Sequence, residues 1–373
     1  MTKKRIEWPV LLFMTINPLA AVILTPIYFY YYGFQWDILV FSLVFAAATN
    51  LSITAGYHRL FSHKSYDAHP IAKFLFLMVG ASAYQGSALK WSSDHRRHHT
   101  HIDGEKDPYN INEGFWYAHM GWLFFKDSVN QKIHAPDLEK EWMVKFQDRY
   151  YVPISIFMGF LFPMFIGWLM GSAFGGLIIG GSLRIALTQQ STFFVNSLCH
   201  TLGKQTYSKE ISARDSWFVA VLTHGEGYHN FHHKFQIDYR NGIKWYHWDP
   251  TKWVIRSLNF IGLASKLRQI SNAEILKARL QAEASEMRQL GFAEEKLHAM
   301  RETILDAQNR MKKLREDYEQ FKVDASKKRE ELKEAYDLKL AELRRELEIA
   351  QLEFQMGLKL WKVHLRSVEY VKI

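Results

Sequence analysis

The chain of 373 residues has a single cysteine, Cys199. An internal disulfide is therefore excluded, and so is an iron–sulfur cluster held by thiolates, which takes about four cysteines. A chain so poor in cysteine is typical of chemistry that faces a reducing cytosol. The sequence also lacks a glycine-rich dinucleotide fingerprint and a haem signature, so any redox chemistry needs electrons from a separate protein.

Lysine and arginine are missing from two long stretches, between Arg5 and Arg59 and from Tyr150 to Leu183. Four apolar runs lie in and beside these gaps, each near the roughly 20 residues that a helix needs to cross a bilayer. They cover about 9–32, 37–57, 152–170 and 174–195. The first run is too long for a signal peptide and no cleavage site follows it, so we predict four retained transmembrane helices.

The basic residues predict how these helices are oriented. The N-terminus, the segment Arg59–Arg149 and the tail beyond Lys204 carry the flanking lysines and arginines, so the positive-inside rule places all three in the cytoplasm. In a bacterium this membrane is the inner membrane. The shorter apolar stretch Ile71–Met78 is expected inside the cytosolic cap or at the interface, with a fifth span as the alternative. Arg184, inside the fourth span, needs a protein interior and a partner.

Proline does not occur after Pro250, and beyond about Ser265 lysine, glutamate, arginine, alanine and leucine dominate. Apolar residues then recur at intervals of three and four, the heptad pattern of helices that pack side by side. They are Leu297, Met300, Ile304, Ala307, Met311, Leu314, Tyr318, Phe321 and Ala325, and later Leu340, Leu343, Leu347, Ala350 and Phe354. We predict a membrane domain over 1–265 and a coiled-coil-like helical extension over 266–373, as a long helix or a helical hairpin.

Four roles stay open for this extension: it joins copies into a homo-oligomer, packs over the cytosolic cap, binds an electron donor, or is a solvated stalk. The net charge of +9 suits anionic lipid, an acidic protein or an anionic substrate, and does not choose among them. We expect membrane lipid as a partner and no nucleic acid.

Nine of the 17 histidines fall into four short motifs, one of which adds an asparagine. The motifs are His58 and His63; His95, His98 and His99; Asn196 and His200; and His229, His232 and His233. Residues three or four apart share one face of an α-helix, so the members of the last three motifs can converge. His58 and His63 are five apart and diverge on an ideal α-helix, so we expect a helix end or an unwound turn there. All four motifs lie at the predicted boundary between membrane and cytoplasm.

The number of histidines bears on the kind of site. Imidazole binds iron, zinc and copper. Nine imidazoles exceed the about four ligands of a zinc site, so we predict two metal ions. An all-nitrogen site with open positions favours redox iron that meets O2. The alternatives are scattered structural histidines, or a non-catalytic membrane protein that binds or transports a metal; the latter needs polar residues along the spans, whereas these histidines gather at one end.

Four segments resemble the membrane fatty acid desaturase family, of the acyl-CoA Δ9 (stearoyl-CoA) type. They are Thr54–His63, Asp94–His99, Asn196–His200 and Gly225–His233, the last reading GEGYHNFHH. The resemblance covers about residues 8–265 and implies an all-α integral membrane protein whose cytosolic helical cap holds a non-haem di-iron site. It implies one iron bound by His58, His63, His95, His99 and His232, and another bound by His98, His200, His229 and His233, with Asn196 reaching the second through a water.

The same resemblance implies an O2-dependent enzyme that places a cis double bond, at Δ9, in a long-chain saturated acyl-CoA. The substrate-binding positions that it implies are Gln85 and Thr192 near a bend of the acyl tunnel, Phe193 beside the acyl chain, and Ser42 and Ala46 at the end of the tunnel. Phe193 replaces a tryptophan of the family, and Ser93 replaces an arginine that contacts CoA in animal relatives. The small residues at positions 42 and 46 suggest room for a palmitoyl or longer chain.

Electrons are expected from a separate ferredoxin, or from a cytochrome b5-like donor with its reductase. The basic candidates for docking it are Arg96, Arg97, Lys204, Lys209, Lys234 and Arg240, and the candidates for supporting the ligands are Asp94, Asp107, Glu226 and Asn230. Two alternative activities stay open: a di-iron hydroxylase of membrane lipid or alkane, and a desaturase of acyl-lipid rather than acyl-CoA.

Overall fold

The computed structural model describes residues 5–125, 135–326 and 333–371, with side chains for 5–125, 135–324 and 335–367. Two compact units make up the chain. The first comprises Met1–Gln205 and Glu210–Gln269, and the second comprises Thr206–Lys209 and Ile270–Ile373. Each unit has a buried apolar cluster of its own. The main division falls at residues 269 and 270, where the sequence predicts 265 and 266.

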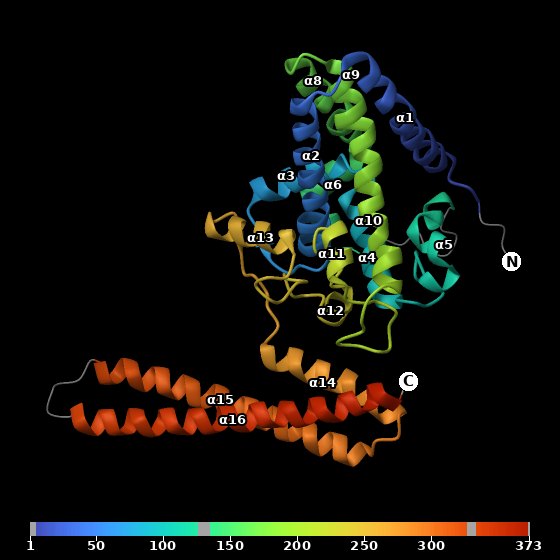
Figure 1. Ribbon diagram of the computed structural model, residues 1–373. Coiled ribbons are helices and arrows are strands. Elements are labelled where there is room, and N and C mark those ends of the chain that lie inside the picture. Colours follow the sequence, from blue (N-terminus) through green and yellow to red (C-terminus); the bar gives the residue numbers. More distant parts are fainter. Residues whose placement is uncertain (1–4, 126–134, 327–332, 372–373) are drawn as a thin grey trace. The chain divides into compact units, whose positions relative to one another are not determined.

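The first unit is mainly helical (Figure 1). Its N-terminal half contains α1 (Trp8–Tyr32), α2 (Trp36–Leu51), η1 (Ser52–Ser62), β1 (Asp67–Ala68), α3 (Pro70–Ala81), α4 (Ala88–His101), η2 (Ile111–Glu113), α5 (Phe115–His119), η3 (Gly121–Phe124), η4 (Leu138–Lys140) and α6 (Trp142–Arg149). Its second half contains α7 (Tyr151–Ile156), η5 (Phe157–Leu161), α8 (Phe162–Leu169), α9 (Ala173–Gly175), η6 (Gly176–Leu183), α10 (Arg184–Thr201), α11 (Trp217–Leu222), α12 (His229–Lys234), α13 (Pro250–Phe260) and β2 (Ala264–Ser265).

Among the described residues, three helical runs are long and apolar enough to cross a membrane: Trp8–Tyr32, Trp36–Ser62 and Tyr151–Leu169. They coincide with the first three predicted spans. Apolar side chains such as Val22 and Leu43 are 70% and 69% exposed on them, which suits contact with lipid. Gly33, at φ 71°, makes the turn from α1 to α2, and exposed tyrosine, phenylalanine and tryptophan side chains surround it. Such a belt is typical of a membrane–water interface.

The fourth predicted span lies in a continuous helical run formed by α9, η6 and α10. Arg184 sits at the junction of η6 and α10 with 2% of its surface exposed. Its guanidinium donates to the carbonyl oxygens of Gly180, Gly159 and Ser82 and to Thr49 Oγ1, over 2.7–3.3 Å. The charge is therefore balanced by neutral dipoles from several helices, and not by a carboxylate.

The segment after α2 is wound as a π-helix. In η1 the backbone N–H of His63 donates to the carbonyl of His58 at 3.1 Å, a bond from residue i+5 to residue i. This winding brings residues five apart to the same side, and the two imidazole rings lie 4.8 Å apart. The sequence predicts a helix end or an unwound turn here. The helix end is confirmed, because η1 ends at Ser62 and His63 is its C-cap residue. The π-helical winding before it, and not an unwound turn, completes the convergence.

A helical cap follows the ends of the first spans. The predicted short helix over 71–78 is α3, which buries Ala72, Phe76 and Leu77 in the core of the unit and leaves Ile71 and Leu75 exposed. In the described part of the chain, β1 and β2 are strands of two residues each. They pair antiparallel, with Asp67 opposite Ser265. This pairing fastens the start of the cap to the end of the unit.

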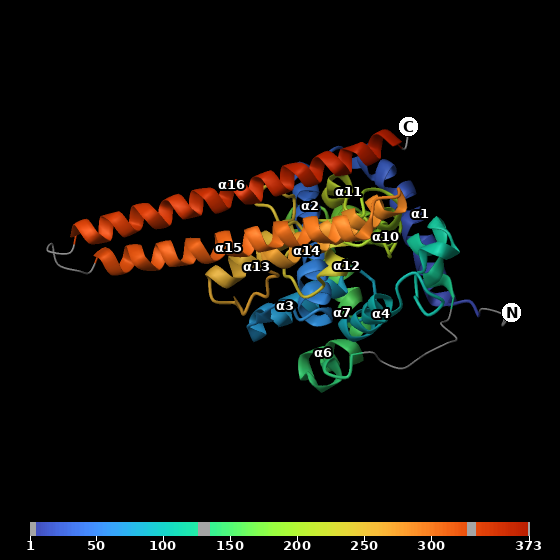
Figure 2. The same ribbon diagram turned by 90° about the horizontal axis from the view of Figure 1, so that it is seen from below.

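The described part of the second unit contains three helices, α14 (Asn272–Gln289), α15 (Glu294–Ser326) and α16 (Lys333–Val371). Helix α14 begins at a capping box in which Ser271 and Glu274 each bond the other's backbone N–H at 3.2 Å. Helices α15 and α16 run side by side as an antiparallel hairpin, with Arg310 3.2 Å from Glu353 (Figures 1 and 2). Trp361 donates to Glu283 at 2.7 Å and joins α16 to α14.

Candidate metal centre and substrate cavity

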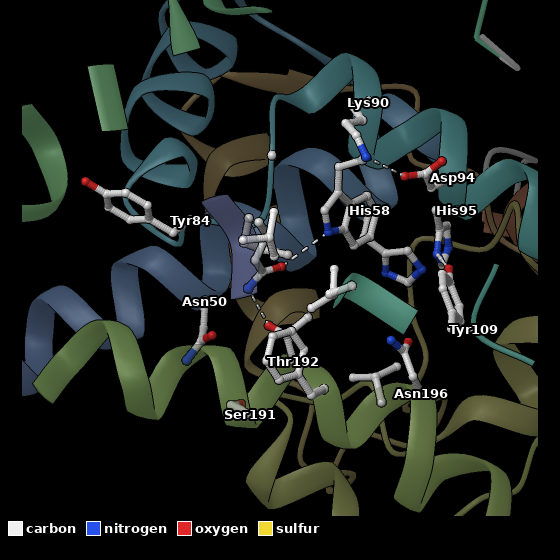
Figure 3. Close-up of a pocket in the computed structure, with 18 of the residues that line it drawn as sticks. Asn50, His58, Tyr84, Lys90, Asp94, His95, Tyr109, Ser191, Thr192 and Asn196 are labelled. Carbon is white, nitrogen blue, oxygen red and sulfur yellow. Dashed lines mark hydrogen bonds and ion pairs between the residues drawn. The ribbon is translucent and has the colours of Figure 1, made fainter. Parts of the chain in front are cut away.

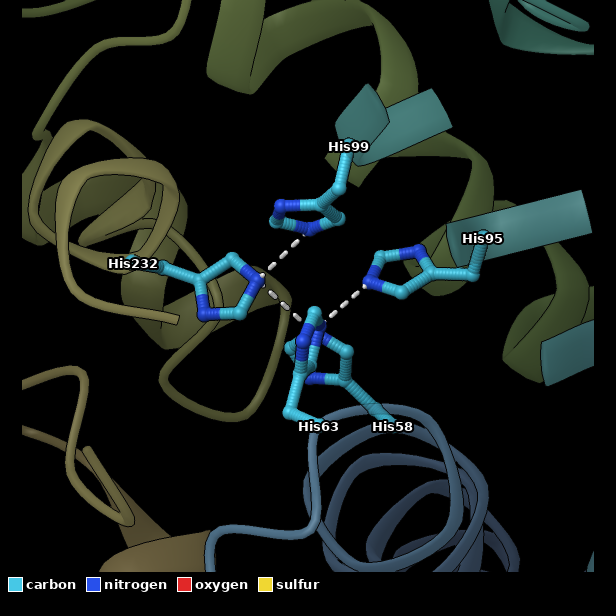
Figure 4. Close-up of side chains that lie close together, drawn as sticks. All are labelled: His58, His63, His95, His99 and His232. Carbon is cyan, nitrogen blue, oxygen red and sulfur yellow. Dashed lines mark hydrogen bonds between the residues drawn. The ribbon is translucent and has the colours of Figure 1, made fainter. Parts of the chain in front are cut away.

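The first group of histidines comes from three separate parts of the unit. Its members are His58 from η1, His63 at the end of η1, His95 and His99 from α4, and His232 from α12. Figure 4 shows the five rings turned toward a common centre. One nitrogen of each lies within 4.8 Å of every other. Neighbouring Nε2 atoms are 2.9 Å apart for His58 and His232, and 2.8 Å apart for His63 and His95.

The second group consists of His98 from α4, His200 from α10, and His229 and His233 from α12, again within 4.8 Å of one another. The Nε2 atoms of His98 and His233 are 3.3 Å apart, and those of His233 and His229 are 3.1 Å apart. His200 Nε2 is buried without a hydrogen-bond partner. The membership of the two groups equals the division that the resemblance implies.

This arrangement of nitrogens fits a bound cation. Ligand bonds of about 2.1 Å at right angles place neighbouring nitrogens about 3 Å apart, close to the Nε2 separations seen in both groups. Hydrogen bonding does not account for five nitrogens that converge on one point, because each neutral imidazole has a single N–H to donate. A buried orphan such as His200 Nε2 costs free energy unless something accepts its lone pair or proton.

Burial also prepares these imidazoles for metal. Loss of hydration lowers the pKa of His95, His99 and His232 well below the ordinary value of histidine, and the neighbouring histidines lower it further. The rings are therefore neutral at physiological pH, with lone pairs free to bind a cation.

Carboxylates contact two of the ligand candidates at Nδ1, the ring nitrogen that points away from the centre of the group. His98 Nδ1 lies 2.9 Å from Asp107, and His58 Nδ1 lies 3.0 Å from Glu226. Glu226 is itself held by Arg59 at 3.0 Å and by Asn241 at 2.7 Å. Such contacts fix the tautomer and direction of a metal-binding imidazole. Asp107 and Glu226 are among the sequence candidates for this role, whereas Arg59 and Asn241 carry no sequence signal of it.

Two further ligand candidates have polar partners that sequence reasoning missed. His200 Nδ1 lies 2.6 Å from Ser212 Oγ, and Ser212 in turn bonds Asp103 at 2.5 Å. His95 Nδ1 lies 3.2 Å from the hydroxyl of Tyr109. Asp103 belongs to the acidic run that follows the second histidine motif, so a signal for it exists. Ser212 is distant in sequence from every motif and has none.

Other predicted supporting and docking residues have different contacts. Asp94 pairs with Lys90 and Arg97 at 3.4 and 3.3 Å, and Asn230 donates to the backbone of Ala213. Several of the basic docking candidates form ion pairs within the chain: Arg96 with Asp137, Arg97 with Asp94, Lys209 with Glu286 and Arg240 with Asp238. Lys204 and Lys234 are exposed.

A cavity of about 640 Å³ lies beside the two groups. Most of its wall is apolar and aromatic, from α1, η1, α4, α7 and α10, and Figure 3 shows part of it around Tyr84, His58 and Asn196. Four cluster histidines contribute to the wall: His58, His95, His98 and His229. The mostly apolar cavity thus borders both histidine groups.

Three predicted substrate residues line this cavity. Gln85 donates to Thr192 Oγ1 at 2.8 Å and accepts from Trp91 Nε1 at 3.2 Å, and Phe193 lies next to Thr192 on α10. Asn196 also lines the cavity, one turn before His200. Ser42 and Ala46 do not occur among the described lining residues; Ser42 is buried and bonds the carbonyl of Ile38 on its own helix. Their place at the end of a tunnel stays a prediction.

A family model and three known proteins that this chain resembles are all described as desaturases. Residues 34–259 match a family model described as fatty acid desaturase. Acyl-CoA desaturase 1 of Saccharomyces cerevisiae is 42% identical over 250 residues, 66% of this chain and 49% of the yeast protein. Stearoyl-CoA desaturase of Homo sapiens is 35% identical over 253 residues, 66% of this chain and 69% of the human protein. Delta-9 acyl-lipid desaturase 1 of Arabidopsis thaliana is 32% identical over 247 residues, 65% of this chain and 79% of the plant protein.

The chain thus spans about half the length of the yeast relative. The matched part of the chain contains all four histidine motifs, and residues 270–373 of the second unit lie outside the family match.

Proposed function

Because the chain belongs to the fatty acid desaturase family, we propose that it introduces a cis double bond, at Δ9, into a long-chain saturated acyl-CoA with O2 as co-substrate. The observation that carries the proposal is the convergence of nine imidazoles in two groups, four of which line an apolar cavity. A cavity of this kind suits a long hydrocarbon chain better than a polar substrate.

Iron is the proposed metal, with one ion in each histidine group and Asn196 reaching the second through a water. Bound iron supplies the oxidising power that removes hydrogen from unactivated methylenes, which acid or base side chains cannot do. The chain's own residues contribute neutral imidazoles, and Asp107 and Glu226 hold His98 and His58 in place.

The position of the double bond follows, in this proposal, from how the chain is held. An inert methylene offers nothing to recognise, so the cavity must fix which carbon faces the histidine groups. Gln85 and Thr192, which bond each other across the wall, and the ring of Phe193 shape that part of it. The apolar lining also keeps water away from the reacting carbons.

The chain is an integral membrane protein, and we place four spans in it. Three of them are the long apolar helices. The fourth is the run α9–η6–α10, whose polar residues Arg184 and Gln189 are buried against protein and not exposed to lipid. The basic residues flanking the spans support a cytoplasmic position for the histidine groups, at the inner membrane in a bacterium. A separate ferredoxin or cytochrome b5-like donor would supply electrons there, with exposed Lys204 and Lys234 as docking candidates.

A second candidate function is desaturation of an acyl chain carried by a lipid. One observation favours it. The matched region covers 79% of the plant acyl-lipid desaturase but only 49% of the yeast acyl-CoA desaturase. Hydroxylation of a lipid or alkane by the same scaffold is the remaining alternative.

Product analysis tests the activity. The chain is expressed in a host that makes no monounsaturated fatty acid, and the double bonds in its lipids are mapped by mass spectrometry. Desaturation yields a product lighter by two hydrogens, whereas hydroxylation yields one heavier by one oxygen. Purified enzyme with acyl-CoA or with diacyl lipid, each with reductant, then separates the two substrate classes.

Metal analysis tests the site. Purified protein is expected to contain about two iron atoms per chain, one per histidine group. His98→Ala and His233→Ala should lower the iron content and abolish the product. His298→Ala, at an exposed histidine of α15, is the matched control and should change neither. Active protein that holds only zinc, or unchanged product from His98→Ala, contradicts the proposal.

A further inference from the structure

Helix α16 has two apolar faces, and the hairpin uses one of them. Ala350, Phe354, Leu358, Trp361 and Leu365 lie buried or half-buried, the last four within the cluster shared with α14 and α15. These residues continue the predicted heptad pattern of Leu340, Leu343 and Leu347. The heptad face is therefore occupied within the chain, and copies cannot meet through it.

The opposite face of α16 carries a second row, which we call the outer stripe. Its members are Ile349, Leu352, Met356, Leu360 and Val363, with 44%, 58%, 69%, 53% and 57% of their surfaces exposed. At about 100° per residue, their spacing of three, four, four and three places them on one side, turned away from the buried row. Single exposed apolar residues are common on proteins, but a row of five at helical spacing marks an interaction surface.

The outer stripe is symmetric about its centre. Leu352 and Leu360 lie four residues before and after Met356, and Ile349 and Val363 lie seven residues before and after it. A helix with this pattern matches a second copy of itself that runs in the opposite direction. Met356 then meets Met356, each leucine meets the other leucine, and isoleucine meets valine, so one patch serves both sides of a two-fold interface.

The charges beside the stripe favour the same partner. Residues 342–353 carry four carboxylates and two guanidiniums, whereas residues 359–366 carry three basic side chains. An antiparallel copy sets the acidic half against the basic half, and a parallel copy would set like against like. Glu348 and Arg366 are 18 residues apart, about five full turns, so they share one edge of the helix and face each other across such a dimer.

We propose that the outer stripe of α16 is a homodimerisation surface that pairs with the same stripe of a second copy, antiparallel and centred on Met356. A lipid surface is the weaker occupant, because helices that lie on membranes carry mostly basic residues beside the apolar face, and this one carries Glu346, Glu348 and Glu353 there. The proposal does not depend on the reaction that the first unit performs.

The oligomeric state of the full-length protein in detergent tests it. We expect a dimer by light scattering or analytical ultracentrifugation. Met356→Glu buries two carboxylates against each other and should raise the dimer Kd by a factor on the order of a hundred or more. Gln351→Glu adds the same charge at an exposed position outside the stripe and should leave the dimer intact.

Cysteine cross-linking tests the direction, since the native Cys199 is buried. Met356→Cys should form a disulfide-linked dimer on mild oxidation. Ile349→Cys alone should not, but a mixture of Ile349→Cys and Val363→Cys chains should. A cross-link between two Ile349→Cys chains indicates a parallel pair and overturns the proposal.

A charge exchange gives an independent readout. Glu348→Arg and Arg366→Glu should each weaken self-association, and mixing the two variants should restore a heterodimer. A monomer at every concentration overturns the proposal, whether the stripe then lies on the same chain or on lipid. A dimer that survives Met356→Glu overturns it as well.

Discussion

Glu226 connects the first histidine group to the rest of the cap. Its Oε2 contacts His58 and Asn241, its Oε1 contacts Arg59, and 3% of its surface is exposed. Burial raises the pKa of this carboxyl, but the Arg59 guanidinium and the hydrogen bonds from His58 and Arg59 outweigh burial and leave the pKa lowered. The ionised form therefore persists and can accept the N–H of His58.

The Glu226→Gln variant should keep the fold and weaken the site. The amide retains the shape but loses the charge, so His58 is held less firmly; we expect metal affinity to fall by about 10- to 100-fold. Competition with a chelator measures this. Asp94→Asn is the control, since Asp94 pairs with Lys90 and Arg97 and contacts no histidine of either group in the described contacts. Equal metal affinity in the two variants would contradict the assigned role.

Arg184 shows that a buried charge can be balanced without an opposite charge. Arg184→Met removes bonds to carbonyls that α-helical and π-helical bonding partly satisfies already, so the free energy of unfolding should fall by only about 1–3 kcal/mol. Arg184→Lys keeps a buried charge with fewer donors and should cost more than the methionine variant. Thermal unfolding in detergent compares them, with the exposed Arg149→Met as control. A lysine variant as stable as the native protein refutes this explanation.

At the scale of single residues, spacing along the chain predicts much of the histidine site. Intervals of three and four residues identify which histidines can converge, because an α-helix has a fixed period. Ser212, Asn241 and Asp249 could not be found in this way. They reach the site through loops whose paths depend on packing, and no local pattern records that Asp249 lies 3.0 Å from Arg59.

Among the elements, η1 is the one in which the period of an α-helix does not predict which residues share a face. The period of an α-helix separates His58 from His63, and only the π-helical bonds of this segment bring them together. Nothing in the local sequence specifies that winding. Helix α3 packs tightly against the segment, and its Phe76 leaves no room for a Cβ at Gly56. The three apolar spans were predictable because length and hydropathy suffice to identify them.

A salt bridge at the end of η1 should make stability depend on pH. Asp137 bonds Arg96 and Lys64, and these partners hold the pKa of its carboxyl well below its usual range. A lowered pKa stabilises the fold above the ordinary carboxyl pKa, and the stabilisation is lost as pH falls.

Asp137→Asn should therefore lower stability near neutral pH, by about 1 kcal/mol since the group is one-third exposed, and the difference should shrink below about pH 4. Thermal unfolding over a pH series measures it, with Asp306→Asn on α15 as the exposed control. If the stability difference between Asp137→Asn and the native protein stays constant with pH, the lost stability comes from packing alone and not from the salt bridge.

The whole molecule consists of two units with separate cores. The apolar clusters of the first unit contain residues up to Leu267, and the cluster of the second begins at Leu276. Composition and the heptad pattern predict a helical extension. They could not tell a hairpin from a dimer, because a heptad face packs equally well against a helix of the same chain or of another.

A chain truncated after Gln269 should fold, bind metal and keep its product profile, since both histidine groups and the cavity lie in the first unit. It should be monomeric in detergent if the outer stripe joins the copies. Metal content, product analysis and light scattering on the same preparation provide the readouts. Loss of metal from a folded truncated chain would show that the second unit supports the site.

The winding of η1 also sets a limit on sequence length. Removing one residue between His58 and His63 would turn everything beyond the deletion by nearly a quarter of a turn relative to α2, and would shift Arg59 or His63 away from its partners. An inserted residue would do the same in the other direction. Natural or engineered variants of this segment are thus free to exchange side chains only where the number of residues is kept.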